Sequence, residues 1–200
     1  MPRIPQHIAT VFWEKPETLA PAKFTCGYCG SLVSSEKGWR LIDKNRNQQN
    51  GVFICPDCKC PTFVYPREDA RTPDSAFGSP VQNLPHELEA LYEEARSCTA
   101  HGAYTVSVLI LRKMLMNIAV NQGAAEGLRF IEYVDYLAVN HFIPPNGRHW
   151  VDHIRKKGNE ATHEIALMNH TDAKDLIVFI EMLLRFIYEF PSMIPQPTNP

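Results

Sequence analysis

The chain has 200 residues, of which 44% are hydrophobic and 21% charged, and this composition excludes the disordered class of proteins. The formal net charge of −2 supplies no global positive field, so a nucleic-acid surface has to be a local patch. Prolines and a histidine interrupt the first 12 residues, where a secretory signal needs an apolar run. The longest apolar stretch, 176–190, contains three charged residues, which argues against a membrane span. We therefore expect a soluble, cytoplasmic protein.

Composition divides the chain into five segments. Residues 1–23 contain four prolines and predict an extended lead-in, in which Val11, Phe12 and Trp13 are available to dock on another part of the protein. Residues 24–65 hold most of the cysteines. Residues 66–83 are rich in Pro, Ser, Asp and Arg and predict a linker. The apolar period then changes from two to about 3.6, which indicates helices over residues 84–191, followed by a tail over 192–200.

The cysteines are arranged in closely spaced pairs. Five of the six lie within residues 26–60, where they form the motifs CGYC and CPDC, and Cys98 stands alone on a predicted helix. An even number of cysteines is compatible with disulfides in a secreted chain, but without an export signal the pairing favours metal ligation in a reducing compartment.

The two motifs predict a zinc ribbon. Zinc takes four soft ligands in a tetrahedron, and the two pairs supply Cys26, Cys29, Cys55 and Cys58. The 25 residues between the pairs fit a hairpin, with NRNQQNG as its turn. Four cysteines leave no open coordination position, so we expect structural Zn²⁺ rather than hydrolytic chemistry. Cys60 either replaces Cys58 as a ligand or remains a nearby thiol, and the sequence does not decide between these.

The C-terminal part predicts about five helices. The expected spans are 85–100, 104–121, 128–141, 146–164, and a last helix that starts after the capping residues Thr171 and Asp172 and ends at Pro191. On this last helix the polar residues form one stripe at four-residue spacing, and nearly all other positions are apolar. A helix of this kind is either central in its bundle or packed against a second subunit.

Residues 148–164, RHWVDHIRKKGNEATHE, are the most polar part of the helical region. On a continuous helix Arg155, Asn159 and His163 lie along one face, because each is four residues from the next. These side chains either hydrogen-bond a neighbouring helix or form a functional site. His149 and His153 are also four residues apart, a spacing that is compatible with a second metal site. The segment HWVDH lacks the Glu of a zincin motif, however, so an exposed helix face is the simpler interpretation.

The string from Arg155 to His163, RKKGNEATH, resembles the signature of a bacterial family, domain of unknown function 4145, which is similar to the HEPN superfamily of helical ribonucleases and defence proteins. Residues 103–115 resemble the family's other signature, and LRFIY at 184–188 matches as well. The resemblance covers about residues 80–190. It implies a mainly α fold, a HEPN-like bundle of about five helices, preceded here by the small N-terminal β zinc ribbon. It also implies a homodimer in which the motif helices of two subunits meet across a cleft.

In active HEPN ribonucleases an Arg stabilises phosphate charge and a His several residues later assists proton transfer. The resemblance therefore implies a composite catalytic site of Arg155, Asn159 and His163, acting without metal. Two positions depart from the family pattern. Gly158 stands where an Arg usually precedes the Asn, and Met116 stands where the second signature usually ends in an acidic residue.

Three functional hypotheses follow. The first is a module that binds RNA, DNA or a protein partner in phage defence or restriction. The second is a metal-independent endoribonuclease with the composite Arg, Asn and His site across a dimer. The third is an inactive scaffold for a neighbouring endonuclease or toxin. The basic patch that favours the first hypothesis consists of Arg112, Lys113, Arg148, Arg155, Lys156 and Lys157.

Overall fold

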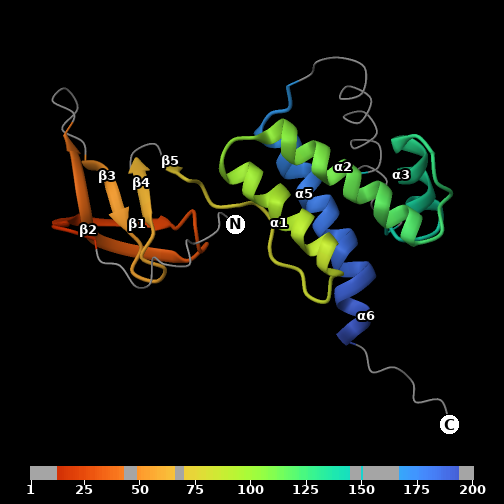
Figure 1. Ribbon diagram of the computed structural model, residues 1–200, viewed down its shortest axis with the longest axis horizontal. Helices are drawn as coiled ribbons and strands as arrows, with labels where there is room; N and C mark the ends of the chain where they lie inside the picture. The colour runs from red at the N-terminus through yellow and green to blue at the C-terminus, as the bar shows by residue number, and fades with distance from the viewer. Residues whose placement is uncertain (1–12, 43–48, 66–69, 145–149, 151–166, 194–200) are drawn as a thin grey trace, which may run out of the picture. The chain divides into compact units, whose positions relative to one another are not determined.

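The computed structural model describes residues 13–42, 49–65, 70–144, 150 and 167–193 (Figure 1). The chain divides into two compact units, Met1–Ala76 and Phe77–Pro200, which we call the strand unit and the helical unit. The helix predicted at 146–164 lies almost entirely outside the described residues.

The strand unit contains one antiparallel sheet in which each strand pairs with the next along the chain. Its five strands are β1 (Glu17–Thr25), β2 (Leu32–Ile42), β3 (Gln49–Ile54), β4 (Pro61–Tyr65) and β5 (Ala70–Thr72). In such a meander every second turn lies at the same end of the sheet. The turn between β1 and β2 therefore shares an end with the turn between β3 and β4.

A small core holds the strand unit together. Phe24 of β1 and Phe53 of β3 are almost fully buried, and their ring centroids lie 6.1 Å apart. Among the described residues this core has eight buried members, two of which are Cys26 and Cys55. Eight side chains are few for an independently stable unit, so the cysteine end of the core is where additional stabilisation is needed.

The helical unit is built around α2 (Tyr104–Asn121), which packs against three other helices. These are α1 (His86–Ala100), α3 (Phe130–Val139) and α5 (His170–Leu184). Figure 1 shows α5 continuing as one rod into α6 (Phe190–Met193), and the turn that joins them, η3 (Arg185–Glu189), is π-helical. The apolar face of α2 is buried at Leu111, Leu115 and Ile118, which is the period that the sequence predicted.

Capping differs from the prediction at α5. Thr171 and Asp172 were the predicted capping residues of this helix, whereas the N-cap residue is Asn169. The Asn169 side chain accepts a hydrogen bond from the Asp172 N–H at 3.1 Å, and the Asp172 carboxylate accepts one from the Asn169 N–H at 3.0 Å. This reciprocal capping box uses Asp at the position where Glu is more usual.

The predicted fold class is wrong. It was a mainly α fold, a HEPN-like bundle of about five helices with a small N-terminal β zinc ribbon. The described residues instead form a five-stranded antiparallel sheet and four helices, counting α5 with its continuation once. Part of β1 lies in residues 1–23, which were predicted to be an extended lead-in and not part of a sheet. Because β1 is an edge strand and its register shifts between Thr18 and Ala22, it accommodates Pro21. The edge strand β5 lies in the predicted linker.

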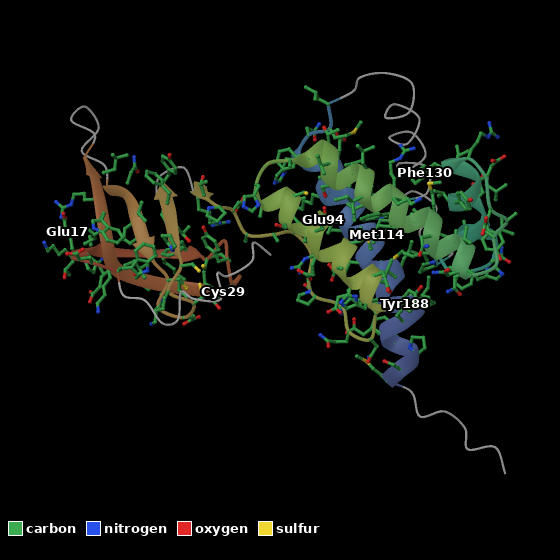
Figure 2. All side chains as sticks on the ribbon, viewed as in Figure 1. Glu17, Cys29, Glu94, Met114, Phe130 and Tyr188 are labelled. Carbon is green, nitrogen blue, oxygen red and sulfur yellow. The ribbon has the colours of Figure 1, made fainter. Side chains whose placement is uncertain are left out.

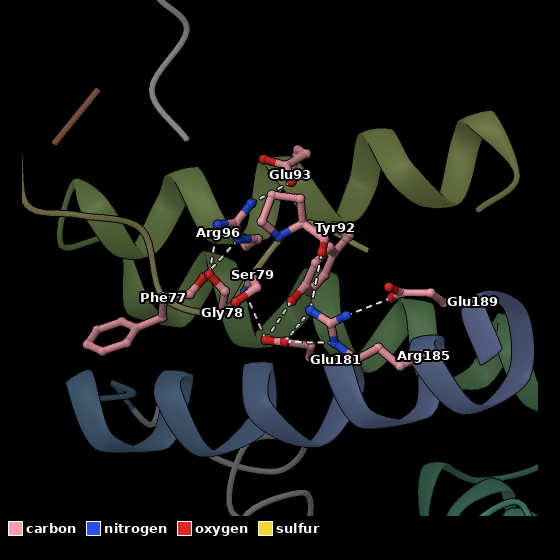
Figure 3. A network of polar contacts seen from close by, with 10 residues as sticks. Phe77, Gly78, Ser79, Tyr92, Glu93, Arg96, Glu181, Arg185 and Glu189 are labelled. Atoms are coloured by element: carbon pink, nitrogen blue, oxygen red, sulfur yellow. Dashed lines mark hydrogen bonds and ion pairs between the residues drawn. The ribbon is translucent and has the colours of Figure 1, made fainter. Parts of the chain in front are cut away.

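A polar network holds residues 77–80 on the helices of their own unit (Figure 3). The guanidinium of Arg96 on α1 is 1% exposed and donates to the carbonyls of Phe77 at 2.9 Å and Gly78 at 2.8 Å. On α5, the Glu181 carboxylate accepts from the Ser79 N–H at 2.9 Å. The polar stripe predicted on the last helix is thus used within the chain, since Arg185 also pairs with Glu181.

Gly78 is required where this segment meets the helices. Its φ of +71° is in the left-handed region, and a Cβ placed there would lie 2.7 Å from the Tyr92 hydroxyl and 2.7 Å from Ile177 Cγ2. Val81, three residues further on, is 4% exposed and belongs to the helical core. Residues 77–81 are therefore part of the packed helical unit.

Candidate metal centre

The two cysteine turns have the same backbone hydrogen bonds. In the first, the Gly30 N–H donates to the Cys26 carbonyl at 2.9 Å, and the Cys26 N–H donates to the Ser31 carbonyl at 2.9 Å. In the second, the Lys59 N–H donates to the Cys55 carbonyl and the Cys55 N–H donates to the Cys60 carbonyl, both at 3.0 Å. Each CxxC motif therefore forms one tight turn that directs two sulfur atoms to the same side.

Left-handed backbone at the fifth position closes each turn. Gly30 has φ +73° and Lys59 has φ +61°. Glycine adopts this left-handed conformation without strain, whereas lysine adopts it at an energetic cost. Gly27 is needed for a different reason, because a Cβ there would lie 2.0 Å from the Pro73 carbonyl oxygen. The chain after β5 thus passes close to the first turn, a contact for which the sequence contains no local signal.

The four predicted ligands come together. The Sγ atoms of Cys26, Cys29, Cys55 and Cys58 all lie within 4.8 Å of one another. The Sγ atoms of Cys26 and Cys58 are 3.6 Å apart, and those of Cys29 and Cys55 are 3.8 Å apart. A regular tetrahedron with metal–sulfur bonds of about 2.3 Å has sulfur atoms about 3.8 Å apart, so these residues fit a tetrahedral thiophilic ion. Figure 2 labels Cys29 in the strand unit.

Burial and hydrogen bonding affect the four thiols unequally. Burial raises the pKa of Cys55 to about 11, and burial also raises the pKa of Cys58. At Cys29 burial acts in the same direction, but hydrogen bonds from the side chain and backbone of Ser31 outweigh it and lower its pKa to about 7. A metal ion that binds here has to displace the protons of Cys55 and Cys58, which is the usual behaviour of a thiolate site.

Cys60 is not among the four clustered ligands. It is fully buried, and it occupies the place in the second turn that Ser31 occupies in the first, with its carbonyl accepting from the Cys55 N–H. Of the two cysteines between which the sequence did not decide, the cluster thus contains Cys58. Cys58 is the fourth residue of the turn and directs its sulfur into the cluster, whereas Cys60 closes the turn.

Two residues of the predicted basic patch are described, and they differ in environment. The Arg112 guanidinium is half-buried and lies 4.2 Å from the centroid of the Phe130 ring, whereas Lys113 on the same helix is exposed. The rest of the patch and the predicted catalytic residues lie outside the described residues: Arg148, Arg155, Lys156, Lys157, Asn159 and His163. The endoribonuclease hypothesis therefore stays a prediction.

A pocket lies next to the second cysteine turn. Its volume is about 450 Å³, and its lining includes Trp13, Lys37, Cys55 and Lys59. Trp13 docks there by donating its indole N–H to the Lys59 carbonyl at 2.6 Å. The sequence indicated that Trp13 was available to dock, but no pattern in it identified the second cysteine turn as the docking position.

Comparison with known proteins bears on the helical unit. No curated protein and no solved structure matches the chain. Within the described part of the chain, no helix combines the length and the apolar character that crossing a bilayer requires. The model of one family, described as Domain of unknown function (DUF4145), matches residues 93–194, a range that runs from α1 to the end of α6. This match covers just over half of the 200 residues and confirms the resemblance to that family, so the chain belongs to the DUF4145 family.

Proposed function

We propose that this protein binds nucleic acid through a strand unit whose structure depends on a bound Zn²⁺ ion. The observation that carries the proposal is the cluster of four Sγ atoms within 4.8 Å. Zinc is the ion that such a set of thiolates favours, because it accepts tetrahedral sulfur coordination and has no redox chemistry. Its role is structural, since four cysteine ligands leave no position for water or substrate.

The function of the strand unit then resides in the surface that the ion stabilises. Counted over Met1–Ala76, the sequence has ten Lys or Arg and eight Asp or Glu residues, whereas the helical unit has ten and fourteen. The positive excess is thus on the unit that contains the cysteine cluster. Close to the second turn, exposed Lys37 and Lys59 lie around the indole of Trp13. Cations next to an aromatic ring are the groups that nucleic-acid-binding surfaces use.

Metal analysis combined with binding tests this proposal. We expect one Zn²⁺ per purified chain, with iron as the competing outcome for a four-thiolate site. Fluorescence anisotropy with labelled single-stranded RNA and DNA should show binding that disappears after zinc is removed by a thiol-compatible chelator. Binding should return when Zn²⁺ is added and should not return with Mg²⁺. A chain that contains zinc and binds neither RNA nor DNA contradicts the proposed function.

A further inference from the structure

The geometry of the pocket beside the second cysteine turn points to a specific ligand. We propose that it binds one unpaired nucleobase of a single strand, stacked on Trp13, while Lys37 and Lys59 contact the neighbouring phosphates. This inference rests on the proposed nucleic-acid function and adds where and how the strand is recognised.

The aromatic wall of the pocket is held in place before a ligand arrives. The Trp13 indole N–H donates to the Lys59 carbonyl at 2.6 Å, and its ring contacts Trp39 edge to face, with centroids 5.7 Å apart and an interplanar angle of 73°. An edge-to-face contact covers at most one face of a ring, and Trp13 is only partly buried and lines the pocket. A fixed aromatic face is suited to stacking because no side-chain ordering is needed on binding.

The other walls fit a flat, partly apolar ligand. Pro16 and Pro56 line the pocket and present rigid rings, and the volume of about 450 Å³ is in the range of small-ligand sites. Ser34 and Glu36 also line it and are exposed. Their hydroxyl and carboxylate supply a donor and acceptors for the polar edge of a base.

The charges of the pocket favour a nucleotide over an acidic peptide. Lys37 and Lys59 are exposed point charges of the kind that contacts phosphates. The Lys59 ammonium donates to the Pro56 carbonyl, which keeps it near the second turn. The Glu36 carboxylate would repel an acidic side chain placed between the two lysines, whereas it accepts hydrogen bonds from the amino group of a base. A base in a duplex is stacked and paired, so the inference applies to single strands.

The pocket and the cysteine cluster share one residue, Cys55. Cys55, one of the four clustered cysteines, lines the pocket, and its N–H is held by the Cys60 carbonyl. The neighbouring Ile54 carbonyl accepts from the buried Ser35 hydroxyl at 2.7 Å. Loss of the metal would therefore release the wall that carries Cys55 and Pro56.

The first test replaces the aromatic face. In the zinc-loaded full chain, we expect Trp13→Ala to weaken binding of a short labelled adenine-rich RNA about tenfold, because one base loses its stacking partner. Trp13→Phe should retain most of the affinity. Wild-type tryptophan fluorescence should be quenched by the RNA, and this quenching should persist in the control Trp150→Phe, whose ring stacks on Phe179 in the helical unit. Unchanged zinc content shows that each variant is folded.

The second test separates phosphate contacts from general charge. Lys37→Gln and Lys59→Gln should each reduce the slope of log affinity against log salt by about one. Arg40→Gln removes a positive charge from an exposed position of β2 that does not line the pocket, and it should leave the slope unchanged.

The outcomes distinguish this inference from the proposed function. Zinc-dependent RNA binding that is unaffected by Trp13→Ala overturns the pocket assignment and leaves the proposed function standing. The absence of binding to any nucleic acid by the zinc-loaded chain overturns both. Equal affinity for a duplex of the same sequence, or displacement of the RNA by a polyglutamate peptide, also overturns the assignment, because neither ligand has a free base to stack.

Discussion

Cys58 and Cys60 are two positions apart along the chain and occupy different places in the second turn: Cys58 belongs to the cysteine cluster, and the Cys60 carbonyl closes the turn. The difference arises from the hydrogen bonds of the turn, in which the Cys55 N–H donates to the carbonyl of the residue five positions later. That residue is Cys60, and the equivalent residue of the first turn is Ser31. The Cys60 side chain is fully buried and lies outside the cluster of four Sγ atoms.

This difference leads to a prediction for matched serine variants. Cys58→Ser should abolish stoichiometric zinc binding, since it removes one of four thiolates and a serine hydroxyl is a poor ligand for zinc. Cys60→Ser should retain one zinc per chain, because serine already occupies the equivalent place in the first turn. Elemental analysis of both purified variants checks this. Retention of zinc by the Cys58 variant together with its loss from the Cys60 variant would show that Cys60 is the fourth ligand.

At the level of the elements, side chains of α1 and α5 both bind the short segment that precedes α1. Arg96 and Glu181 hold the backbone of residues 77–79 by hydrogen bonds, and Glu181 is more than a hundred residues away from Ser79 in the sequence. The chain reaches this position only because Gly78 adopts a left-handed conformation against Ile177 and Tyr92.

Two glycine substitutions separate conformation from packing. Gly78 and Gly102 both have φ above +70°, but a Cβ at Gly102 would meet nothing within 4 Å. Gly102→Ala should lower the free energy of unfolding of the helical unit by about 1 kcal/mol, the cost of left-handed backbone alone. Gly78→Ala should lower it by about 2–4 kcal/mol, because overpacking adds to that cost. Urea unfolding followed by helical circular dichroism measures both, and equal effects would contradict the proposed packing role.

At the scale of the whole molecule, the two units have cores of different size. Among the described residues, 23 buried side chains form the core of the helical unit, whereas eight form that of the strand unit, two of them clustered cysteines. Apolar burial in the larger core is enough to stabilise the helical unit, whereas the smaller core needs a further source of stability. A metal ion held by the four clustered cysteines would supply it.

Removal of the metal should therefore affect the units unequally. Chelation should unfold the strand unit, so the fluorescence of Trp13 and Trp39, which contact each other there, should change and their surroundings become more exposed to water. The helical signal in circular dichroism should be largely retained. Readdition of Zn²⁺ should restore the fluorescence. Simultaneous loss of both signals would show that the helical unit also depends on the ion.

Local patterns in the sequence were sufficient to predict the four clustered cysteines and the positions of two helices. The spacing of CGYC and CPDC identified the four cysteines of the cluster, because each pair is formed within one turn. The apolar period placed α2 at Tyr104–Asn121 and α1 within one residue of its start, because helical hydrogen bonds join residues four apart. The family signature, which is also a local string, was confirmed over residues 93–194.

What only the tertiary structure decided involves residues that are far apart in the chain. The edge strands β1 and β5 were missed because strand pairing supplies their hydrogen bonds, and prolines mask the pattern in β1. Such long-range contacts bring Pro73 close to Gly27, pack residues 77–80 against α1 and α5, and form the pocket around Trp13. The sequence by itself thus determined which sulfurs meet and where two helices lie, since these follow from neighbours within a turn. The sheet and its pocket required the folded chain, because pairing and packing between distant segments leave no local pattern.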